Sequence, residues 1–298
     1  AYAEYYYFRG NPQMAAQMAK QYLTCSNTEL RLSACLIYAF SNLSIGQIEQ
    51  AKQVLEKIKS TLKEDKERAQ QIKVIDAFIA MAAAVLLHLP LPEDIPSMQE
   101  FIPILPFGLR SFALYVEAHY LYLQKNYEKS IGIIEAALAM GANQYPIPAI
   151  YLHLAAVMDY MSLKQLEKAE NHLLIAWELA RPDDLIEGFG EHHGLLGGML
   201  EAVIKPKWPE DFKRIISITY EFSAGWRKIH NPVTGHEVAD DLSTTEFAVA
   251  MLAARGWTNS EIAKHLNISA NTVKTHISQA IKKLHVENRK DLKQYMLK

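Results

Sequence analysis

The sequence has little of what marks several large protein classes. It contains two cysteines, Cys25 and Cys35, in 298 residues, too few for a disulfide framework. We therefore expect a reducing, cytoplasmic location. The longest apolar run, residues 77–87, is too short to span a bilayer, so no membrane association is expected. The net charge of −2 shows no overall excess of basic residues.

Motifs of common enzymes are also missing. There is no GxxxxGK[ST] phosphate loop, no nucleophile elbow and no HExxH metal motif. His192 and His193 are adjacent, so on a helix they point in different directions and make a poor chelate. His230, His236 and Glu237 surround a segment that is better interpreted as a solvated linker. We expect no enzymatic activity, no metal site and no cofactor.

The charges that are present are unevenly distributed. Residues 242–298 hold 9 Lys and Arg against 4 Asp and Glu, a net charge of +5, while the preceding residues hold 22 against 29, a net charge of −7. A basic module is thus attached to an acidic body. Pro232 and Gly235 lie between the two and are typical of a linker. The sequence predicts a body at 1–229, a linker at 230–241 and a C-terminal domain at 242–298.

Helical periodicity dominates the body, and the alternation typical of strands is scarce, which predicts an all-α fold. Four stretches share a turn followed by a helix: GNPQMAAQMAKQYL, GQIEQAKQVLEKIK, KNYEKSIGIIEAAL and KQLEKAENHLLIAW. Their spacings are 36, 79 and 39 residues when they are aligned on Pro12, Ile48, Tyr127 and Leu166. A degenerate unit around LHLPLPEDIPSMQEF would fill the longest gap.

Small side chains recur at two fixed distances from these anchors. Three residues after each anchor stand Ala15, Ala51, Ser130 and Ala169. Nine residues before each stand Ala3, Ala39, Ala118 and Val157. Such positions let two antiparallel helices approach closely. The pattern, over residues 2–179, resembles the tetratricopeptide repeat, whose helix pairs stack into a superhelix with a concave binding surface.

Three further expectations concern the body. Its frequent tyrosines either pack between helices or line an aromatic groove for a ligand or partner; they include Tyr2, Tyr5, Tyr6, Tyr7, Tyr115, Tyr120 and Tyr122. Ala1 is not a methionine, and in the repeat register the chain opens inside a helix. We therefore expect the chain to be a piece of a longer protein. A further helix is expected from Pro209 to about His230.

Residues 242–298 are dense in helix-start signals. A capping box joins a Ser or Thr to a Glu three residues later, and a polar residue before an apolar run caps a helix. The signals are Ser243 with Glu246, Thr258 with Glu261, Ser269, and Asn288 with Asp291. They predict four short helices, of which the second and third are joined by a tight turn.

The third of these helices, residues 270–284, has two unlike sides. One is apolar, with Val273, Ile277, Ala280, Ile281 and Leu284. The other carries Asn271, Lys274, Thr275, Ser278 and Lys282, and no acidic residue occurs from 271 to 284. An ordinary solvated face normally mixes charge signs, whereas lysines, hydroxyls and an amide suit phosphate oxygens and base edges in a major groove.

The stretch LSTTEFAVAMLAARGWTNSEIAKHLNISANTVKTHISQAIKKLHVENR resembles the LuxR-type helix-turn-helix domain of bacterial transcription regulators, over residues 242–297. The resemblance implies that base edges are read by Lys274, Thr275 and Ser278. It implies backbone contacts from Thr258, Asn271, Thr272, Lys282 and Lys283. It also implies a dimer on DNA through the last helix, with Arg289, Leu292, Tyr295 and Met296.

The sequence departs from that family at two positions. Thr245 stands where the family usually has Arg, so a buried ion pair is expected to be missing. His285 stands where Gly is usual, at a site expected to need a left-handed backbone, which His adopts less readily than Gly. Neither position belongs to the expected DNA-binding face.

Together, the two halves resemble the large regulators related to the activator of the maltose regulon, which carry an ATPase module ahead of the repeats; no such module occurs here. This resemblance implies a transcription regulator whose repeats sense a small-molecule or protein effector, and whose partners are double-stranded DNA and RNA polymerase. One alternative is a repeat scaffold that recruits proteins and uses its C-terminal domain mainly for dimerisation. A phosphorelay receiver is not expected, because the N-terminal part lacks alternating strands and helices.

Overall fold

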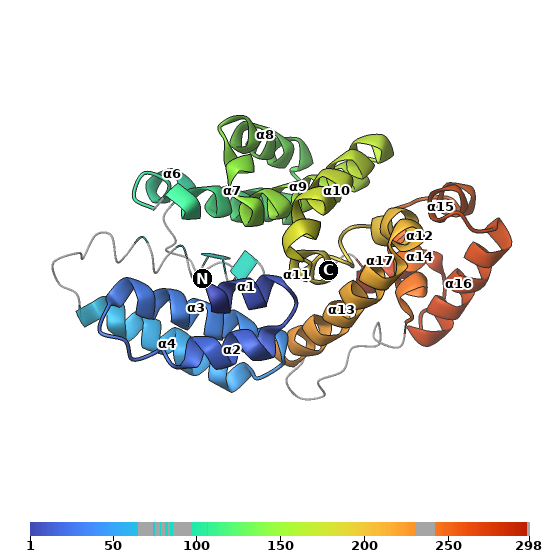
Figure 1. The fold of residues 1–298 in the computed structure, drawn as a ribbon. Helices are drawn as coiled ribbons and strands as arrows, with labels where there is room; N and C mark the ends of the chain where they lie inside the picture. The colour runs from blue at the N-terminus through green and yellow to red at the C-terminus, as the bar shows by residue number, and fades with distance from the viewer. Residues whose placement is uncertain are drawn as a thin grey trace.

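The computed structural model describes residues 1–64, 74, 78, 81–82, 84–85, 97–105, 107–230 and 242–296. Every element in these residues is a helix, which confirms the predicted all-α fold (Figure 1). The degenerate unit expected at residues 87–101 is described only from 97 on. The linker expected at 230–241 lies outside the described residues except for His230.

The body runs as far as α13, the helix expected from Pro209. Its helices are α1 (Tyr2–Phe8), α2 (Pro12–Lys20), α3 (Thr28–Ser44), α4 (Ile48–Glu64), α6 (Met98–Phe101), α7 (Phe107–Leu123), α8 (Tyr127–Ala139), η2 (Ala142–Gln144), α9 (Pro146–Ser162), α10 (Leu166–Ala180), η3 (Arg181–Asp183), α11 (Glu187–Glu191), η4 (Leu200–Ile204), α12 (Lys205–Lys207) and α13 (Pro209–His230). The C-terminal helices are α14 (Thr244–Ala254), α15 (Asn259–Leu266), α16 (Ala270–Lys283), η6 (Arg289–Leu292) and α17 (Lys293–Met296).

The four anchors of the repeat pattern are the first residues of α2, α4, α8 and α10. Each of these helices packs against the helix before it, giving the pairs α1–α2, α3–α4, α7–α8 and α9–α10. Two residues before each anchor the backbone turns through the left-handed region, at Gly10 (φ 78°), Gly46 (71°), Lys125 (61°) and Lys164 (58°). One local turn therefore recurs in all four pairs.

The small residues lie where the pairs close. The small residues that stand three residues after each anchor are 0% exposed: Ala15, Ala51, Ser130 and Ala169. Among the residues that stand nine residues before each anchor, Ala39, Ala118 and Val157 are buried, whereas Ala3 is partly exposed. Larger side chains at the buried positions would force the helices of a pair apart.

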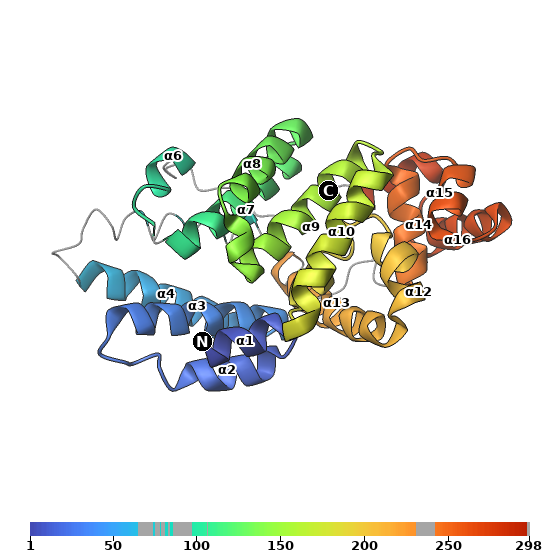
Figure 2. The ribbon, with the colours of Figure 1, turned by 45° about the horizontal axis from the view of Figure 1, so that its top comes forward.

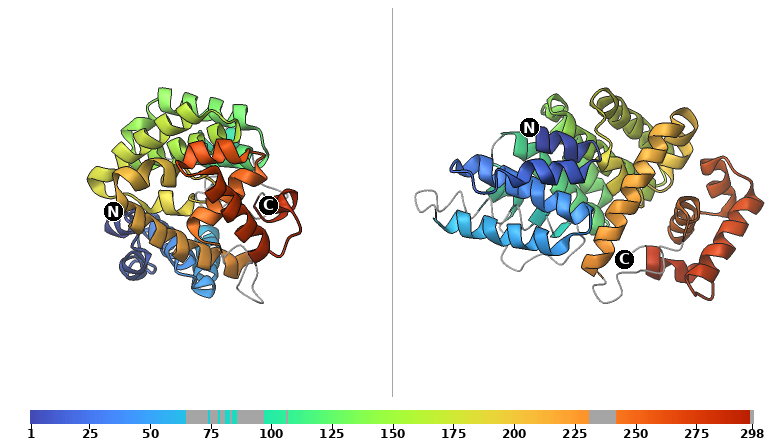
Figure 3. Two further views of the ribbon diagram at one scale, coloured as in Figure 1. Left: turned by 90° about the vertical axis from the view of Figure 1, so that its right-hand side faces the viewer. Right: turned by 60° about the horizontal axis from the view of Figure 1, so that its bottom comes forward.

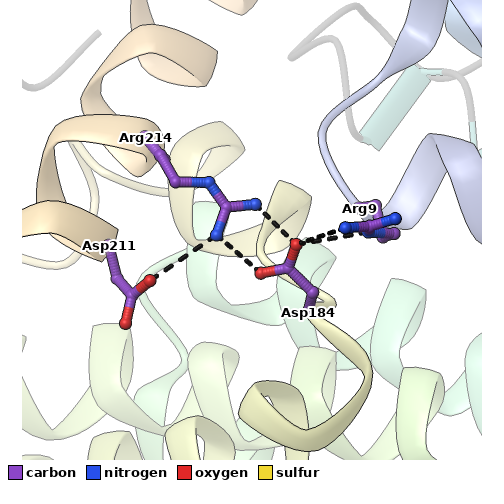
Figure 4. A network of polar contacts seen from close by, with 4 residues as sticks. All are labelled: Arg9, Asp184, Asp211 and Arg214. Atoms are coloured by element: carbon purple, nitrogen blue, oxygen red, sulfur yellow. Dashed lines mark hydrogen bonds and ion pairs between the residues drawn. The ribbon is translucent and has the colours of Figure 1, made fainter.

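The pairs form two groups joined by the later helices of the body. Figure 1 shows α1–α4 in one group and α7–α10 in the other, with α11 and α13 between them. Polar contacts fasten α1 to this connection. Asp184 lies in a left-handed turn and accepts hydrogen bonds from Arg9, on the α1–α2 turn, and from Arg214 of α13, which also pairs with Asp211 (Figure 4).

The burial of the tyrosines bears on the two alternatives expected for them. Tyr7, Tyr115 and Tyr122 are buried between helices, whereas Tyr2 and Tyr5 are exposed. For the three buried residues, packing between helices is the observed role.

Among the described residues, no helix is both long and apolar enough to cross a membrane.

The C-terminal domain lies at one end of the body, beside α10, η4 and α12 (Figure 2). Its own helices pack around α14, which contacts α15, α16, η6 and α17. Figure 3 shows α16 on the side of this domain that faces away from the body.

Candidate nucleic-acid interface

The helix starts of the C-terminal domain are capped as the sequence predicts. Ser243 accepts a hydrogen bond from the Glu246 N–H, and Glu246 accepts one from the Ser243 N–H at 2.7 Å. Thr258 and Glu261 form the same reciprocal box, with distances of 3.2 and 2.6 Å. Ser269 caps α16 through the Thr272 N–H at 3.0 Å, and Asn288 with Asp291 caps η6. These bonds satisfy N–H groups that would otherwise have no partner at the helix ends.

A tight turn places α16 against α14 and α15. Asn267 ends α15 in the left-handed conformation, with φ 52°, and Ser269 begins the next helix two residues later. The apolar side of α16 is buried in the domain core through Val273, Ile277, Ala280 and Leu284, with Ile281 partly buried. Because this side is buried, the opposite side of α16 must face solvent.

That solvent-facing side is the polar one. Asn271, Lys274, Thr275, Ser278 and Lys282 are all exposed. The two hydroxyl groups donate to carbonyl groups of their own helix, from Thr275 to Asn271 O at 3.0 Å and from Ser278 to Lys274 O at 3.0 Å. Each hydroxyl oxygen still has acceptor capacity toward solvent.

A shallow hollow follows this face and is lined by Lys274, Thr275, Ser278, Lys282 and Gln279. Gln279 is not among the site residues predicted from the sequence. Its position directly after Ser278 and four residues after Thr275 places it on the same helical face. A Gln side chain can donate and accept toward one adenine edge. We call these five residues, together with Asn271, the reading face.

The other expected contact residues are less free. Thr258 is exposed, but its hydroxyl is engaged in the capping box. The Thr272 hydroxyl lies 2.8 Å from that of Ser269. Lys283 forms an ion pair with Glu246 at 2.7 Å, so a phosphate contact from Lys283 would compete with that pair.

The Glu246–Lys283 pair bears on the expected loss of an ion pair at Thr245. Glu246 is buried and its carboxylate is paired from α16. Burial acts to raise the pKa of Glu246, but hydrogen bonds from Lys283 and Ser243 outweigh burial and lower it. An ion pair from residue 245 is therefore missing, but the neighbouring Glu246 still forms one, with Lys283. The pair also ties α16 to the start of α14.

The segment expected to form a dimer contact also builds the core of its own domain. Leu292 and Met296 are buried against it, and Arg289 donates to Trp257 O and to the Asn259 side chain. The side chain of Tyr295 lies outside the described part of the structure. A contact between two copies through this segment would therefore use residues other than Leu292 and Met296, such as the exposed Lys290 and Lys293. The dimer remains a prediction.

His285 follows α16 with φ 52°, which confirms the left-handed backbone expected there.

The adjacent histidines of the body, His192 and His193, have separate hydrogen-bond partners. His193 Nε2 lies 2.8 Å from Glu201 Oε1, and His192 Nε2 lies 2.8 Å from the Tyr115 hydroxyl. Burial lowers the pKa of His192 to about 4, so this ring is neutral at pH 7. In the described ranges, no three His, Cys, Asp or Glu side chains are grouped as a metal site.

Residues 240–296 match the family described as bacterial regulatory proteins, luxR family. The match covers the C-terminal domain. It agrees with the capped helices, the tight turn and the exposed polar face of α16. The C-terminal domain is therefore a LuxR-family DNA-binding domain.

Two curated relatives are response regulators. The chain is 42% identical to the two-component response regulator PprB of Pseudomonas aeruginosa over 62 residues, which are 21% of each chain. It is 40% identical to the response regulator protein VraR of Staphylococcus saprophyticus over 110 residues, which are 35% of this chain and 53% of that relative. The chain thus spans about half or less of the length of these relatives.

Proposed function

We propose that the chain is a sequence-specific DNA-binding transcription regulator of bacterial origin that works in the cytoplasm. Helix α16 lies in the major groove and reads bases through Lys274, Thr275, Ser278 and Gln279. The observation that carries this proposal is the reading face: it is exposed, it has no acidic residue, and the core of the domain holds it in place through the opposite side of the helix.

The backbone contacts follow from the same placement. Asn271 lies in the first turn of α16, where free backbone N–H groups and the helix dipole favour a phosphate. Lys282 lies in the last turn and supplies a mobile positive charge. Thr258, Thr272 and Lys283 flank the reading face and add phosphate contacts once their present hydrogen bonds or ion pair are exchanged. Because these contacts displace counterions, binding weakens steeply with salt.

The body supplies regulation. The repeated left-handed turns and buried small residues of the four pairs support a tetratricopeptide-like superhelix, as in the regulators related to the maltose activator. Such a superhelix presents a concave surface for a small-molecule or protein effector. Two copies bind an inverted repeat, with the segment from Arg289 to Met296 near their contact, and RNA polymerase is the further partner of the DNA-bound dimer.

Selection of bound duplexes from a random pool by the full chain tests this function. We expect an enriched motif with two related half-sites in inverted orientation. Enrichment of a single half-site would contradict the dimer and leave the reading face intact. Recovery of no motif, together with capture of a protein by the body, would favour the scaffold interpretation.

Replacement of one lysine tests the reading face itself. Lys274→Ala should weaken binding to the selected duplex by about 1–3 kcal/mol while changing binding to unrelated duplexes much less, if Lys274 reads a base. Lys129→Ala is the matched control, because Lys129 is an exposed lysine of α8 far from α16 in the chain. Competition titrations at a fixed salt concentration measure both variants. Equal losses in the two variants would remove Lys274 from the reading face.

A further inference from the structure

The C-terminal domain is fastened to the body by direct contacts, in addition to the chain connection. Arg255, which follows α14, donates from Nη2 to the Tyr122 hydroxyl at 2.8 Å and to Leu195 O at 3.0 Å. His265 of α15 lies with Nε2 3.1 Å from Gly197 O. Burial lowers the pKa of His265, so a neutral ring donates this bond.

The body receives these groups in the segment Gly-Leu-Leu-Gly-Gly, residues 194–198, which we call the cradle. Gly197 has φ 59° and Gly198 has φ 77°, conformations that residues with a side chain rarely adopt. A Cβ atom on Gly198 would lie 2.9 Å from Leu266 Cδ2 of the C-terminal domain. On Gly194 it would lie 3.0 Å from the Phe247 ring. The absence of side chains thus lets the two parts meet at van der Waals distance.

A second set of contacts joins the body to the C-terminal domain at the α9–α10 turn. We call the whole contact region between the two parts the junction. Lys164, at the α9–α10 turn, is 3.4 Å from Glu261 and lies over the Trp257 ring at 5.6 Å from its centre. Trp257 is buried, and the hydrophobic core continues from the body through this junction into the C-terminal domain. A continuous core across the junction resists separation more than an exposed ion pair does, because exposed pairs contribute little.

The cradle is itself anchored at its N-terminal side. It is separated only by His192 and His193 from α11, whose last residue, Glu191, accepts hydrogen bonds from the Tyr7 hydroxyl at 2.5 Å and from the Tyr151 hydroxyl at 2.7 Å. Tyr7 belongs to α1 and Tyr151 to α9. The segment that holds the C-terminal domain is therefore connected over a few residues to both groups of helix pairs.

The contacts to the cradle leave the reading face free. They come from α14, from Arg255 and from α15, while the reading face belongs to the outer side of α16. We propose that the cradle is a docking site through which the body sets the position and orientation of the recognition helix, with Arg255 and His265 as positioning residues. This inference rests on the proposed function for its effect on DNA, but docking itself does not.

Docking has a consequence for recognition. When two copies bind an inverted repeat, a rigidly held recognition helix can reach both half-sites only at certain separations along the duplex. A domain joined by a flexible connection alone tolerates more separations. The body, together with the reading face, therefore determines which operators are bound.

Charge reversal at Arg255 in the full chain tests the docking. Arg255→Glu places a carboxylate against Leu195 O, whereas Lys129→Glu makes the same change in net charge on the exposed surface of α8. We expect backbone ¹⁵N relaxation of residues 242–296 to report the rotational correlation time of the whole chain in the wild type and in Lys129→Glu. In Arg255→Glu the correlation time of this domain should fall at least twofold. Gly198→Ala, made from the body side, should act in the same direction.

The DNA readout compares two duplexes that carry the selected half-sites. One has the selected separation and the other is longer by about 5 base pairs, half a helical turn. We expect wild type and Lys129→Glu to prefer the first duplex at least tenfold, and Arg255→Glu to prefer it less than threefold. A short correlation time for this domain in the wild type, or equal values in all variants, would overturn the docking. Normal docking without specific DNA binding would instead overturn the proposed function and leave the cradle intact.

Discussion

The helix pairs of the body and the helix-turn-helix unit of the C-terminal domain are built alike but differ in what their second helix exposes. Both join two helices through a left-handed residue, Lys164 before α10 in the body and Asn267 before α16 in the C-terminal domain. In the body, α10 buries Ala169 and exposes Glu167 and Lys168, which carry opposite charges. In the C-terminal domain, α16 likewise buries one side, but its exposed side carries Asn271, Lys274 and Thr275 and no acidic residue.

This difference shows that local helix–turn–helix geometry does not by itself define a role. An exposed side that mixes charge signs, as in α10, is typical of a solvated surface. An exposed side with lysines, hydroxyls and an amide but no acidic residue, as in α16, suits a nucleic acid. Substitutions at four sites test this comparison, and the largest effect is expected inside the body.

A larger side chain at a fully buried position between two helices of the body should destabilise the body. Ala169→Leu introduces three carbon atoms at a fully buried site between α9 and α10, so we expect a loss of about 3 kcal/mol in the free energy of unfolding. Ala136→Leu makes the same change on an exposed position of α8 and should cost less than about 0.5 kcal/mol. Urea denaturation measures both. Similar values for the two variants would mean that the pairs do not close as tightly as described.

Buried carboxyl groups sharpen the comparison, because the two parts treat them in opposite ways. Glu246 of the C-terminal domain is paired with Lys283, whereas burial raises the pKa of Asp159 in α9 to about 8. The Ser130 hydroxyl lies 2.9 Å from Ala118 O and 2.6 Å from Asp159 Oδ2. Its one proton cannot serve both acceptors, so a protonated Asp159 donates to Ser130 when Ser130 donates to Ala118.

The sign of the pH dependence follows from the Asp159 proton. Between about pH 4 and pH 8 the folded chain retains a proton that the unfolded chain has released, so stability falls as the pH rises, by up to about 1.4 kcal/mol per unit. Asp159→Asn keeps a donor toward Ser130 and should remove this contribution. Denaturation at three pH values between 5.5 and 7.5 measures the slopes. The exposed control Asp183→Asn should keep the wild-type slope, and an unchanged slope in Asp159→Asn would contradict the protonated state.

The connection between the two groups of pairs should be weaker than their interiors. Asp184→Asn removes the ion pairs to Arg9 and Arg214 but keeps a residue that tolerates the left-handed backbone. We expect a loss of about 1 kcal/mol near pH 7, because these side chains are partly exposed to screening.

Salt and pH distinguish this loss from a packing defect. Partial burial acts to raise the pKa of Asp184, but hydrogen bonds and charge from Arg214 and Arg9 outweigh it and lower the pKa. The contribution is present above about pH 4 and is lost as the pH falls through the lowered pKa. It should also shrink in 1 M salt. A loss that is independent of both conditions would indicate damage to packing at Asp184.

The smallest effect is expected at the end of α16. His285→Gly removes a side chain from a left-handed residue, which should stabilise the C-terminal domain by about 0.5 kcal/mol after the greater backbone entropy of Gly is deducted. Thermal unfolding measures the change, and Asn267→Gly should give less because Asn already tolerates this conformation. Affinity for DNA should not change, since His285 lies outside the reading face.

Much of this molecule could be predicted from local chemistry. The anchors Pro12, Ile48, Tyr127 and Leu166 each begin a helix, and the capping boxes at Ser243 and Thr258 form as expected. These features depend on residues within one turn of each other, whose preferences act before any tertiary contact forms. The reading face could be predicted for the same reason, since helical spacing alone separates Lys274 from Val273.

Other features had no local signal. The pairing of Lys283 with Glu246, the burial of Leu292 and Met296 in their own domain, and the contact of Arg255 with Leu195 join residues far apart in the chain. A lysine or leucine in an amphipathic segment is compatible with several partners, and only the packing of the other helices selects one.

The sequence by itself determined where helices begin, where they turn, and which side of α16 is polar, because these follow from caps, backbone preferences and periodicity. The tertiary structure decided that the cradle holds α14 and α15 against the body while α16 stays outward. The reason is that the glycines of the cradle permit many conformations, and only close approach of the two parts selects the observed one.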